Sequence, residues 1–206
     1  MLRITAALVL LAGLIAFGGY LDLVGRTPWT NPARRHLRDM KDRREAPATT
    51  QAMTLRDFEA LPHNLSLAEY AGLERRGVTL EGYVQQMLDA SDGDLHLEIA
   101  TTPRAAAGPD TTYVTGEITP GWRDGTRWTY AALLQALRPN RGGVTWWLGG
   151  PRRARITGWL LYDRYDRVPS QYSRQHGARA TGWEIHPVTA IAVWDDSLGA
   201  FTELAR

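Results

Sequence analysis

Residues 77–100 read GVTLEGYVQQMLDASDGDLHLEIA, and after a polar loop residues 111–119 read TTYVTGEIT. Apolar and polar side chains alternate in three runs of this stretch, which is the pattern of β-strands with one buried face. In the second run the leucines and the isoleucine would face inward, which leaves Asp94, His96 and Glu98 on the other face. An Asp-Gly pair between the first two runs is a strong hairpin turn. The stretch therefore predicts three consecutive strands.

Two further strands and a helix complete the pattern. Residues 153–163 (RARITGWLLYD) and 182–195 (GWEIHPVTAIAVWD) alternate in the same way, with Pro187 marking a bulge or an edge. Residues 128–137 (WTYAALLQAL) between them and the first three strands form an amphipathic helix. The order β-β-β-α-β-β is that of an OB-fold. The sequence therefore predicts an all-β domain with minor α content, a five-stranded OB-fold-like barrel over residues 78–196.

The rest of the chain divides into four segments. Residues 1–24 contain an unbroken apolar run at 4–21, about 27 Å as a helix, which suits a transmembrane anchor or a signal peptide. Residues 25–53 are charged and contain prolines, which is typical of a linker, with room for a short charged helix. Residues 54–77 contain two short helices with capping-box sequences. Residues 197–206 are expected to be a loose tail.

The apolar run predicts contact with a membrane through residues 4–21. Basic residues follow it, and the positive-inside rule taken alone would keep the domain in the cytoplasm. Most of those charges, however, lie more than ten residues past the run. The sequence therefore favours a membrane-anchored or secreted protein whose domain lies outside the cytoplasm.

The composition excludes some kinds of site and partner. The chain has no Cys, which excludes disulfides and thiolate metal sites. Residues 47–206 carry 16 Lys and Arg against 18 Asp and Glu, so the domain itself is slightly acidic. A general nucleic-acid-binding domain has a basic surface, and nucleic acid is therefore not expected as a partner.

A cluster of histidines and carboxylates is expected on one face of the barrel. Strand alternation places these side chains opposite the core: His96, Glu98, Glu117, Glu184 and His186. Such groups suit a borderline ion such as Zn²⁺ or Mn²⁺, for which the candidate ligands are His96, Glu117, Glu184 and His186. They could instead hold a water for general acid–base chemistry, or form a surface network of hydrogen-bonded pairs that fastens strand to strand. The sequence leaves these interpretations open.

A ligand groove is a further possibility, because OB-folds bind oligonucleotides or oligosaccharides across their second and third strands. The candidate ligand-binding residues combine acidic positions of the barrel with a long polar loop: Asp94, Glu98, Asp163, Arg164, Tyr165, Arg167, Tyr172 and Arg174. Arginines interleaved with aromatic rings suit stacking on a ligand. The acidic first hairpin disfavours nucleic acid, and an envelope protein or glycan is the expected partner.

The Asp-Gly-Asp triplet at residues 92–94 resembles the Ca²⁺-binding hairpin of staphylococcal-nuclease-like OB-folds. Those nucleases continue with an Arg on the next strand and an Asp-x-Pro-Glu loop. Residues 111–119 and their continuation have neither, so the resemblance does not imply nuclease activity. The triplet is interpreted as a turn.

A wider resemblance is to a group of exported, largely uncharacterised bacterial OB-fold proteins. The motifs that carry it are DGDLHLEI, YVTGEI, RITGWLLYD and WEIHPV. The matched residues are Asp94, His96, Glu117, Asp163, Glu184 and His186. Many of these proteins have Cys in their long loops, whereas this chain has none. The resemblance implies an OB-fold in the bacterial periplasm or cell envelope, but no particular activity.

Together these observations favour a non-catalytic OB-fold binding module of the bacterial cell envelope. The alternative is a metal-dependent enzyme of the hydrolase type that uses the His/Glu cluster on the barrel face.

Overall fold

The computed structural model describes four stretches of the chain: residues 31–103, 112–139, 150–164 and 178–206. The expected apolar helix at residues 4–21 lies outside the described residues. Among the described residues, no helix is both long and apolar enough to cross a membrane.

The chain forms two compact units, Met1–Asp39 and Met40–Arg206. The described part of the first unit is most of helix α2 (Pro32–Lys41). Asn31 caps this helix, because its Oδ1 accepts hydrogen bonds from the backbone N–H of Ala33 at 3.0 Å and of Arg34 at 3.2 Å. The short charged helix expected after the apolar run is therefore present.

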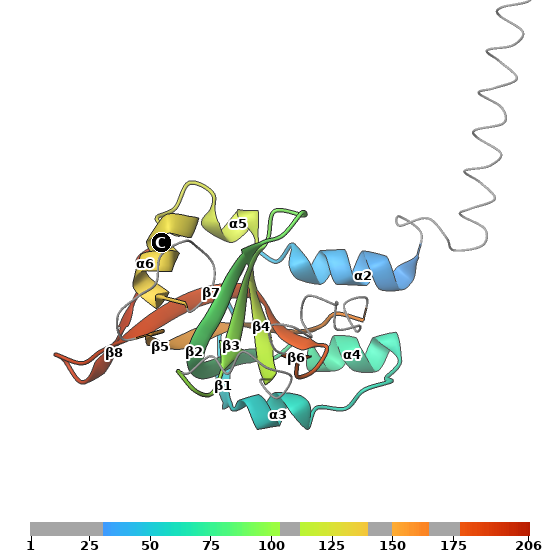
Figure 1. Ribbon diagram of the computed structural model, residues 1–206. Helices are drawn as coiled ribbons and strands as arrows, with labels where there is room; N and C mark the ends of the chain where they lie inside the picture. The colour runs from blue at the N-terminus through green and yellow to red at the C-terminus, as the bar shows by residue number, and fades with distance from the viewer. Residues whose placement is uncertain (1–30, 104–111, 140–149, 165–177) are drawn as a thin grey trace, which may run out of the picture. The chain divides into compact units, whose positions relative to one another are not determined.

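The second unit is built around a closed barrel. Its five strands are β2 (Gly77–Asp89), β3 (Leu95–Ala100), β4 (Thr112–Ile118), β5 (Arg153–Tyr162) and β7 (Trp183–Asp195). They pair in the order β4-β3-β2-β5-β7, and a parallel pairing of β4 with β7 closes the sheet (Figure 1). This order, with a helix between β4 and β5, is that of a Greek-key OB-type barrel. The predicted five-stranded OB-fold-like barrel is confirmed.

The barrel interior is filled by the apolar residues that the strand alternation assigned to it. Leu95 and Leu97 of β3 are fully buried there. A glycine permits the closure, because a Cβ at Gly116 would lie 3.2 Å from the Val188 side chain across the barrel. The register between β5 and β7 shifts around Gly158, next to Pro187, so the expected bulge is also confirmed.

Two helices connect β4 to β5 across the part of the chain that the structure describes. They are α5 (Pro120–Arg123) and α6 (Tyr130–Leu137). The helix expected over residues 128–137 begins two residues later, because Thr129 is its N-cap and accepts a hydrogen bond from the backbone N–H of Ala132 at 3.2 Å. Its Leu133 is buried against the barrel core.

Three short strands extend the barrel beyond the prediction. Strand β1 (Thr50–Met53) pairs in parallel with β2, β6 (Ala178–Arg179) with β4, and β8 (Ala200–Glu203) pairs antiparallel to β7. The expectation of a loose tail from residue 197 was wrong, because Phe201 of β8 packs edge-on against the Trp194 ring at 5.2 Å. The segment taken as a linker likewise ends in β1 rather than in irregular chain.

The two predicted capping boxes are confirmed. Thr54 caps α3 (Leu55–Glu59) and Ser66 caps α4 (Leu67–Leu73). In each, the cap hydroxyl accepts from the N3 backbone N–H, and the N3 carboxylate accepts from the cap backbone N–H. Helix α4 directs Tyr70 into the core, where its ring stacks on Tyr162 at 4.4 Å. The cap thus fixes an element that closes one side of the barrel.

Replacing Ser66 by Ala is expected to lower the free energy of unfolding by about 1 kcal/mol, because the cap hydroxyl is lost while the Tyr70 ring remains. Urea unfolding of the full chain measures this value. Ser91→Ala, in the exposed β2–β3 turn, is the matched control and should change stability little. Equal effects of the two substitutions would contradict the capping role.

Candidate functional site

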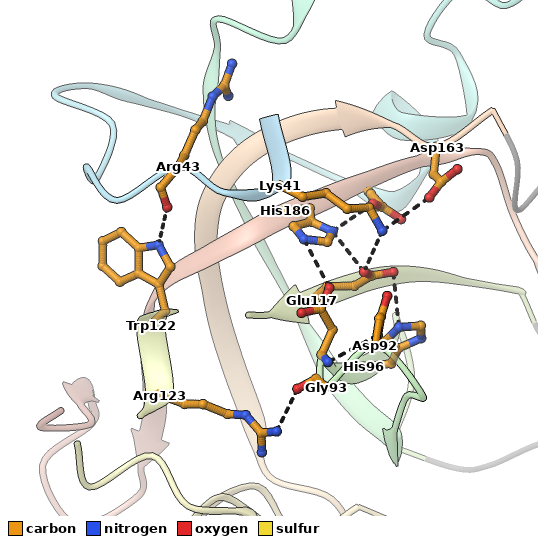
Figure 2. A network of polar contacts seen from close by, with 12 residues as sticks. Lys41, Arg43, Asp92, Gly93, His96, Glu117, Trp122, Arg123, Asp163 and His186 are labelled. Carbon is orange, nitrogen blue, oxygen red and sulfur yellow. Dashed lines mark hydrogen bonds and ion pairs between the residues drawn. The ribbon is translucent and has the colours of Figure 1, made fainter. Parts of the chain in front are cut away.

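The predicted His/Glu cluster assembles on the side of the barrel where β3, β4 and β7 meet. Asp94 immediately precedes β3, Glu117 lies in β4, and Glu184 and His186 lie in β7. Their neighbours in β4 and β7, including Ile185, face the barrel interior and are buried. Because β4 pairs with β7, residues about 70 positions apart in sequence come into contact (Figure 2).

The expectation that these side chains face solvent was wrong. Glu184 and His186 are 0% exposed and Glu117 is 1% exposed, and Glu98 is also buried. The reason is that other parts of the chain cover this face of the barrel. Lys41 approaches it from the end of α2, and Arg179 approaches it from β6.

The segment that carries Lys41 belongs to the second unit and is held in place there by three hydrogen bonds of Arg43 and Glu45. The indole Nε1 of Trp122 donates to the Arg43 carbonyl at 2.8 Å, and that of Trp159 donates to the Glu45 carbonyl at 2.8 Å. The Arg43 guanidinium donates to the Glu74 carbonyl at 2.8 Å. These contacts hold the residues after α2 against the barrel and thereby position Lys41.

His186 is at the centre of the cluster. Its Nδ1 lies 2.8 Å from Glu117 Oε2 and 3.0 Å from Glu184 Oε1. Its Nε2 faces Asp94 Oδ2 at 3.5 Å, without a hydrogen-bond partner among the described residues. The imidazole therefore lies between the carboxylates of Glu117 on β4, Glu184 on β7 and Asp94 just before β3.

Cationic side chains surround the two glutamates. The Lys41 Nζ lies 3.5 Å from Glu117 Oε2 and 3.4 Å from Asp163 Oδ2, and Figure 2 shows it directed at both carboxylates. Arg179 pairs with Glu184. Burial alone would lower the pKa of Lys41, but the surrounding carboxylates, Glu117 first, raise it above its ordinary value. Lys41 is therefore a permanent cation at neutral pH.

Burial and mutual charge also shift the pKa values at the centre of the cluster. Burial disfavours the imidazolium of His186, but Glu117 and Glu184 outweigh it and raise the His186 pKa to about 9. Burial raises the pKa of Asp94 to about 6, and burial together with the Glu117 charge raises that of Glu184. Burial opposes ionisation of Glu117 as well, yet the His186 charge holds the Glu117 pKa well below its usual range.

One Asp, one Glu and one His of this cluster could hold a metal ion. A ligand atom from each of Asp94, Glu117 and His186 lies within 4.8 Å of the other two. This group keeps Glu117 and His186 of the predicted set, lacks His96 and Glu184, and adds Asp94. Glu184 instead contacts the Nδ1 of His186, and His96 contacts Glu117 Oε1 at 3.4 Å. Each of the two therefore contacts one of the candidate ligands without being a member of the group.

The candidate ligand-binding residues do not gather in one groove among the described residues. Asp94 and Asp163 belong to the cluster, whereas the Arg164 guanidinium lies over the Tyr70 ring at 5.5 Å. Four others lie outside the described residues: Tyr165, Arg167, Tyr172 and Arg174. The triplet at residues 92–94 is a turn, as predicted, because Gly93 has φ +91° and the backbone N–H of Asp94 donates to Asp92 Oδ1 at 3.2 Å.

A separate polar pocket, of about 550 Å³, lies beside the start of β5 and the end of β7. Arginines and aromatic rings are prominent in its lining, namely Tyr83, Arg138, Arg152, Arg153 and Trp194. The Arg153 guanidinium lies 5.2 Å from the centre of the Trp194 ring, and Arg152 donates to the Trp194 carbonyl at 2.8 Å. The sequence had suggested aromatic–arginine recognition by the long loop together with residues near it in sequence, Arg152 and Arg153 among them.

Comparison with known proteins bears on the fold alone. No protein-family model matches the chain, and no curated protein sequence matches it. Similar solved structures include the asparaginyl-tRNA synthetase of Entamoeba histolytica, with 17% identity and a TM-score of 0.34 over 70% of this chain. The match spans 24% of the synthetase, about a quarter of its length. An OBody bound to hen egg-white lysozyme matches with 16% identity and a TM-score of 0.33, over 66% of this chain and 98% of the OBody. The resemblance to exported bacterial proteins stays a prediction.

Proposed function

We propose that this protein is a non-catalytic OB-fold binding module of the bacterial cell envelope, and that its ligand is an acidic glycan. The observation that carries the proposal is the pocket whose lining includes three arginines, Tyr83 and Trp194 against a single carboxylate, that of Asp196. Its volume of about 550 Å³ lies in the range of small-molecule sites. Aromatic rings offer apolar faces to sugar rings, and guanidinium groups bind carboxylate or phosphate through charge-assisted hydrogen bonds.

The burial of the His/Glu cluster supports binding over catalysis. A general acid or base must come within hydrogen-bond reach of its substrate, about 2.6–3.2 Å. His186 and Glu184 are 0% exposed, so a substrate has no access to their reactive atoms in this conformation. Among the described residues, the cluster therefore offers a substrate no direct contact with His186 or Glu184.

The envelope location rests on the sequence. The apolar run at residues 4–21 would anchor the protein in the membrane or direct its secretion, and the domain would then face the periplasm. A glycan ligand suits that compartment. Protease digestion of intact spheroplasts tests the location: the domain is expected to be cleaved, and protection until lysis would place it in the cytoplasm.

A second candidate function is a metal-dependent hydrolase that holds Zn²⁺ or Mn²⁺. The observation that favours it is the group of Asp94, Glu117 and His186. The neighbouring His96 and Lys41 side chains are 24% and 21% exposed, which would be the route for water or substrate after an opening motion. Turnover of generic ester or phosphoester substrates by the Zn²⁺- or Mn²⁺-loaded full chain, lost in Glu117→Gln, would favour this candidate over the binding module.

The glycan proposal predicts that the full chain binds a carboxylate-bearing disaccharide more tightly than a neutral one of the same size. Calorimetry with N-acetylglucosaminyl-N-acetylmuramic acid and di-N-acetylchitobiose measures both affinities. Arg138→Ala and Arg152→Ala are each expected to weaken binding of the acidic sugar about tenfold, because each removes a charge-assisted hydrogen bond.

Arg127→Ala is the matched control, since Arg127 is exposed and does not line the pocket. Equal binding of the acidic and the neutral sugar, or an equal loss on Arg127→Ala, would contradict the proposal. An unchanged affinity for the acidic sugar in both pocket variants would do so as well.

A further inference from the structure

The cluster contains a buried polar atom whose bonding capacity is unused. His186 is 0% exposed, and its Nε2 has no hydrogen-bond partner among the described residues. Buried polar atoms without a partner are uncommon, because leaving one unsatisfied costs about 1–3 kcal/mol. The atom lies 3.5 Å from Asp94 Oδ2. A carboxylate oxygen that could bind a metal ion therefore lies beside Nε2.

The spacing of the donors suits a small cation. In a tetrahedral site with bonds of about 2.0–2.2 Å, neighbouring ligand atoms lie roughly 3.3–3.6 Å apart. The distance of 3.5 Å between His186 Nε2 and Asp94 Oδ2 falls in this range. Glu117 is the third residue of the group, in which one possible ligand atom of each residue lies within 4.8 Å of the others.

The charge balance also accommodates a divalent cation. The ion pairs of the cluster involve four carboxylates that are more than nine-tenths buried: Asp94, Glu117, Asp163 and Glu184. The permanent cations paired with them are Lys41 and Arg179. Once His186 is a neutral imidazole, as it must be to bind a metal through Nε2, these described groups carry a net charge of −2. A divalent cation neutralises that charge. Burying uncompensated carboxylates in a low-dielectric region is otherwise unfavourable.

The groups behind the donors have the arrangement found around metal ligands. Glu184 Oε1 lies 3.0 Å from His186 Nδ1, so when His186 is a neutral, metal-bound imidazole the proton is on Nδ1 and Nε2 presents its lone pair. His96 lies 3.4 Å from Glu117 Oε1 and orients that carboxylate. Such outer partners fix the tautomer and direction of metal ligands.

From these observations we infer that Asp94, Glu117 and His186 form a binding site for one divalent transition-metal ion, Zn²⁺ or Mn²⁺, whose role is structural. One nitrogen and two oxygen donors, without sulfur, suit these ions. The ion joins the start of β3 to β4 and β7, across the pairing that closes the barrel. The site is independent of the arginine-lined pocket and of the proposed glycan ligand.

The test uses the full chain, purified in detergent and stripped of metal with a chelator. Zn²⁺ is titrated in competition with a chromophoric chelator, and Mn²⁺ by electron paramagnetic resonance. One equivalent is expected to bind, and a hundredfold excess over Kd should raise Tm by about 5–10 °C. Co²⁺ in place of Zn²⁺ should give visible absorption bands of a nitrogen–oxygen site.

Near-isosteric variants assign the ligands. Asp94→Asn and Glu117→Gln should each weaken Zn²⁺ binding by at least about a hundredfold, and Glu184→Gln by about 10- to 100-fold as an outer partner. Asp89→Asn is the matched control, because Asp89 lies in the same hairpin but its side chain is 62% exposed and outside the cluster. It should bind Zn²⁺ as the unaltered chain does.

Less than about 0.1 equivalent of bound metal would overturn the inference. So would unaltered affinity in Asp94→Asn and Glu117→Gln, because binding would then involve surface groups. Circular dichroism checks that the variants fold. Should they not fold, the Co²⁺ spectrum of the unaltered chain decides the question, and the absence of ligand-field bands would contradict the site.

Discussion

Replacing His186 by Leu will lower the free energy of unfolding by about 3–5 kcal/mol in chelator-treated protein, the cost of breaking a buried ion pair from one side. Leu has a similar volume, so the change removes the imidazole without opening a large cavity. Glu117 and Glu184 then lose the donor that lies 2.8 Å from one and 3.0 Å from the other. Neither carboxylate has solvent to replace it, since their side chains are 2% and 0% exposed.

His63→Leu is the matched control, because His63 is an exposed histidine outside the cluster. It should change stability by less than about 0.5 kcal/mol. Denaturant unfolding of both variants measures the difference. A loss below about 1 kcal/mol for His186→Leu would mean that the cluster contributes little to the fold.

Metal-free protein will lose stability between pH 6.5 and pH 9. The His186 pKa is about 9 in the folded chain and 6.5 without its partners, so the folded state binds this proton more tightly. The stabilisation is therefore fully present below pH 6.5 and is lost as the pH rises through 9. At about 1.4 kcal/mol for each pKa unit, the loss amounts to roughly 3 kcal/mol.

Urea unfolding at several pH values, with chelator present, measures this loss. His186→Gln is the control, since it keeps a polar side chain but has no group that titrates in this range. Its stability should change little between pH 6.5 and pH 9. A slope shared by both proteins would assign the effect to another group.

Strand alternation predicted much of this molecule, because it depends on local chemistry. It identified the barrel strands and the face that His96, Glu117 and His186 share. Capping boxes at Thr54 and Ser66 were visible in the sequence for the same reason: a cap involves residues only three positions apart.

The packing of Lys41 and Arg179 over the face that carries the cluster could not be predicted, because it depends on contacts between residues distant in sequence. Alternation indicates which side chains share a face, and says nothing of what packs on it. Lys41 lies 76 positions from Glu117, and Arg179 belongs to a strand of two residues with no pattern of its own. Lys41 is the only lysine among 24 basic residues. We interpret this as a bias of base composition, and nothing in the local sequence marks Lys41 as buried.

The replacement of His96 and Glu184 by Asp94 as a candidate ligand has a similar origin. Asp94 precedes β3 rather than lying within it, so its direction depends on the turn at Gly93. The Arg123 guanidinium donates to the Gly93 carbonyl at 2.6 Å and, with the Asp92 side chain, fixes this turn (Figure 2). Strand periodicity cannot describe a residue that a turn orients.

The measurement that tests the central claim most directly is anomalous X-ray diffraction at the zinc edge, on crystals of the full chain grown with Zn²⁺. The account predicts one strong peak about 2.0–2.2 Å from His186 Nε2 and from carboxylate oxygens of Asp94 and Glu117. Zinc bound only at exposed side chains, with His186 Nε2 still facing Asp94 directly, would contradict it.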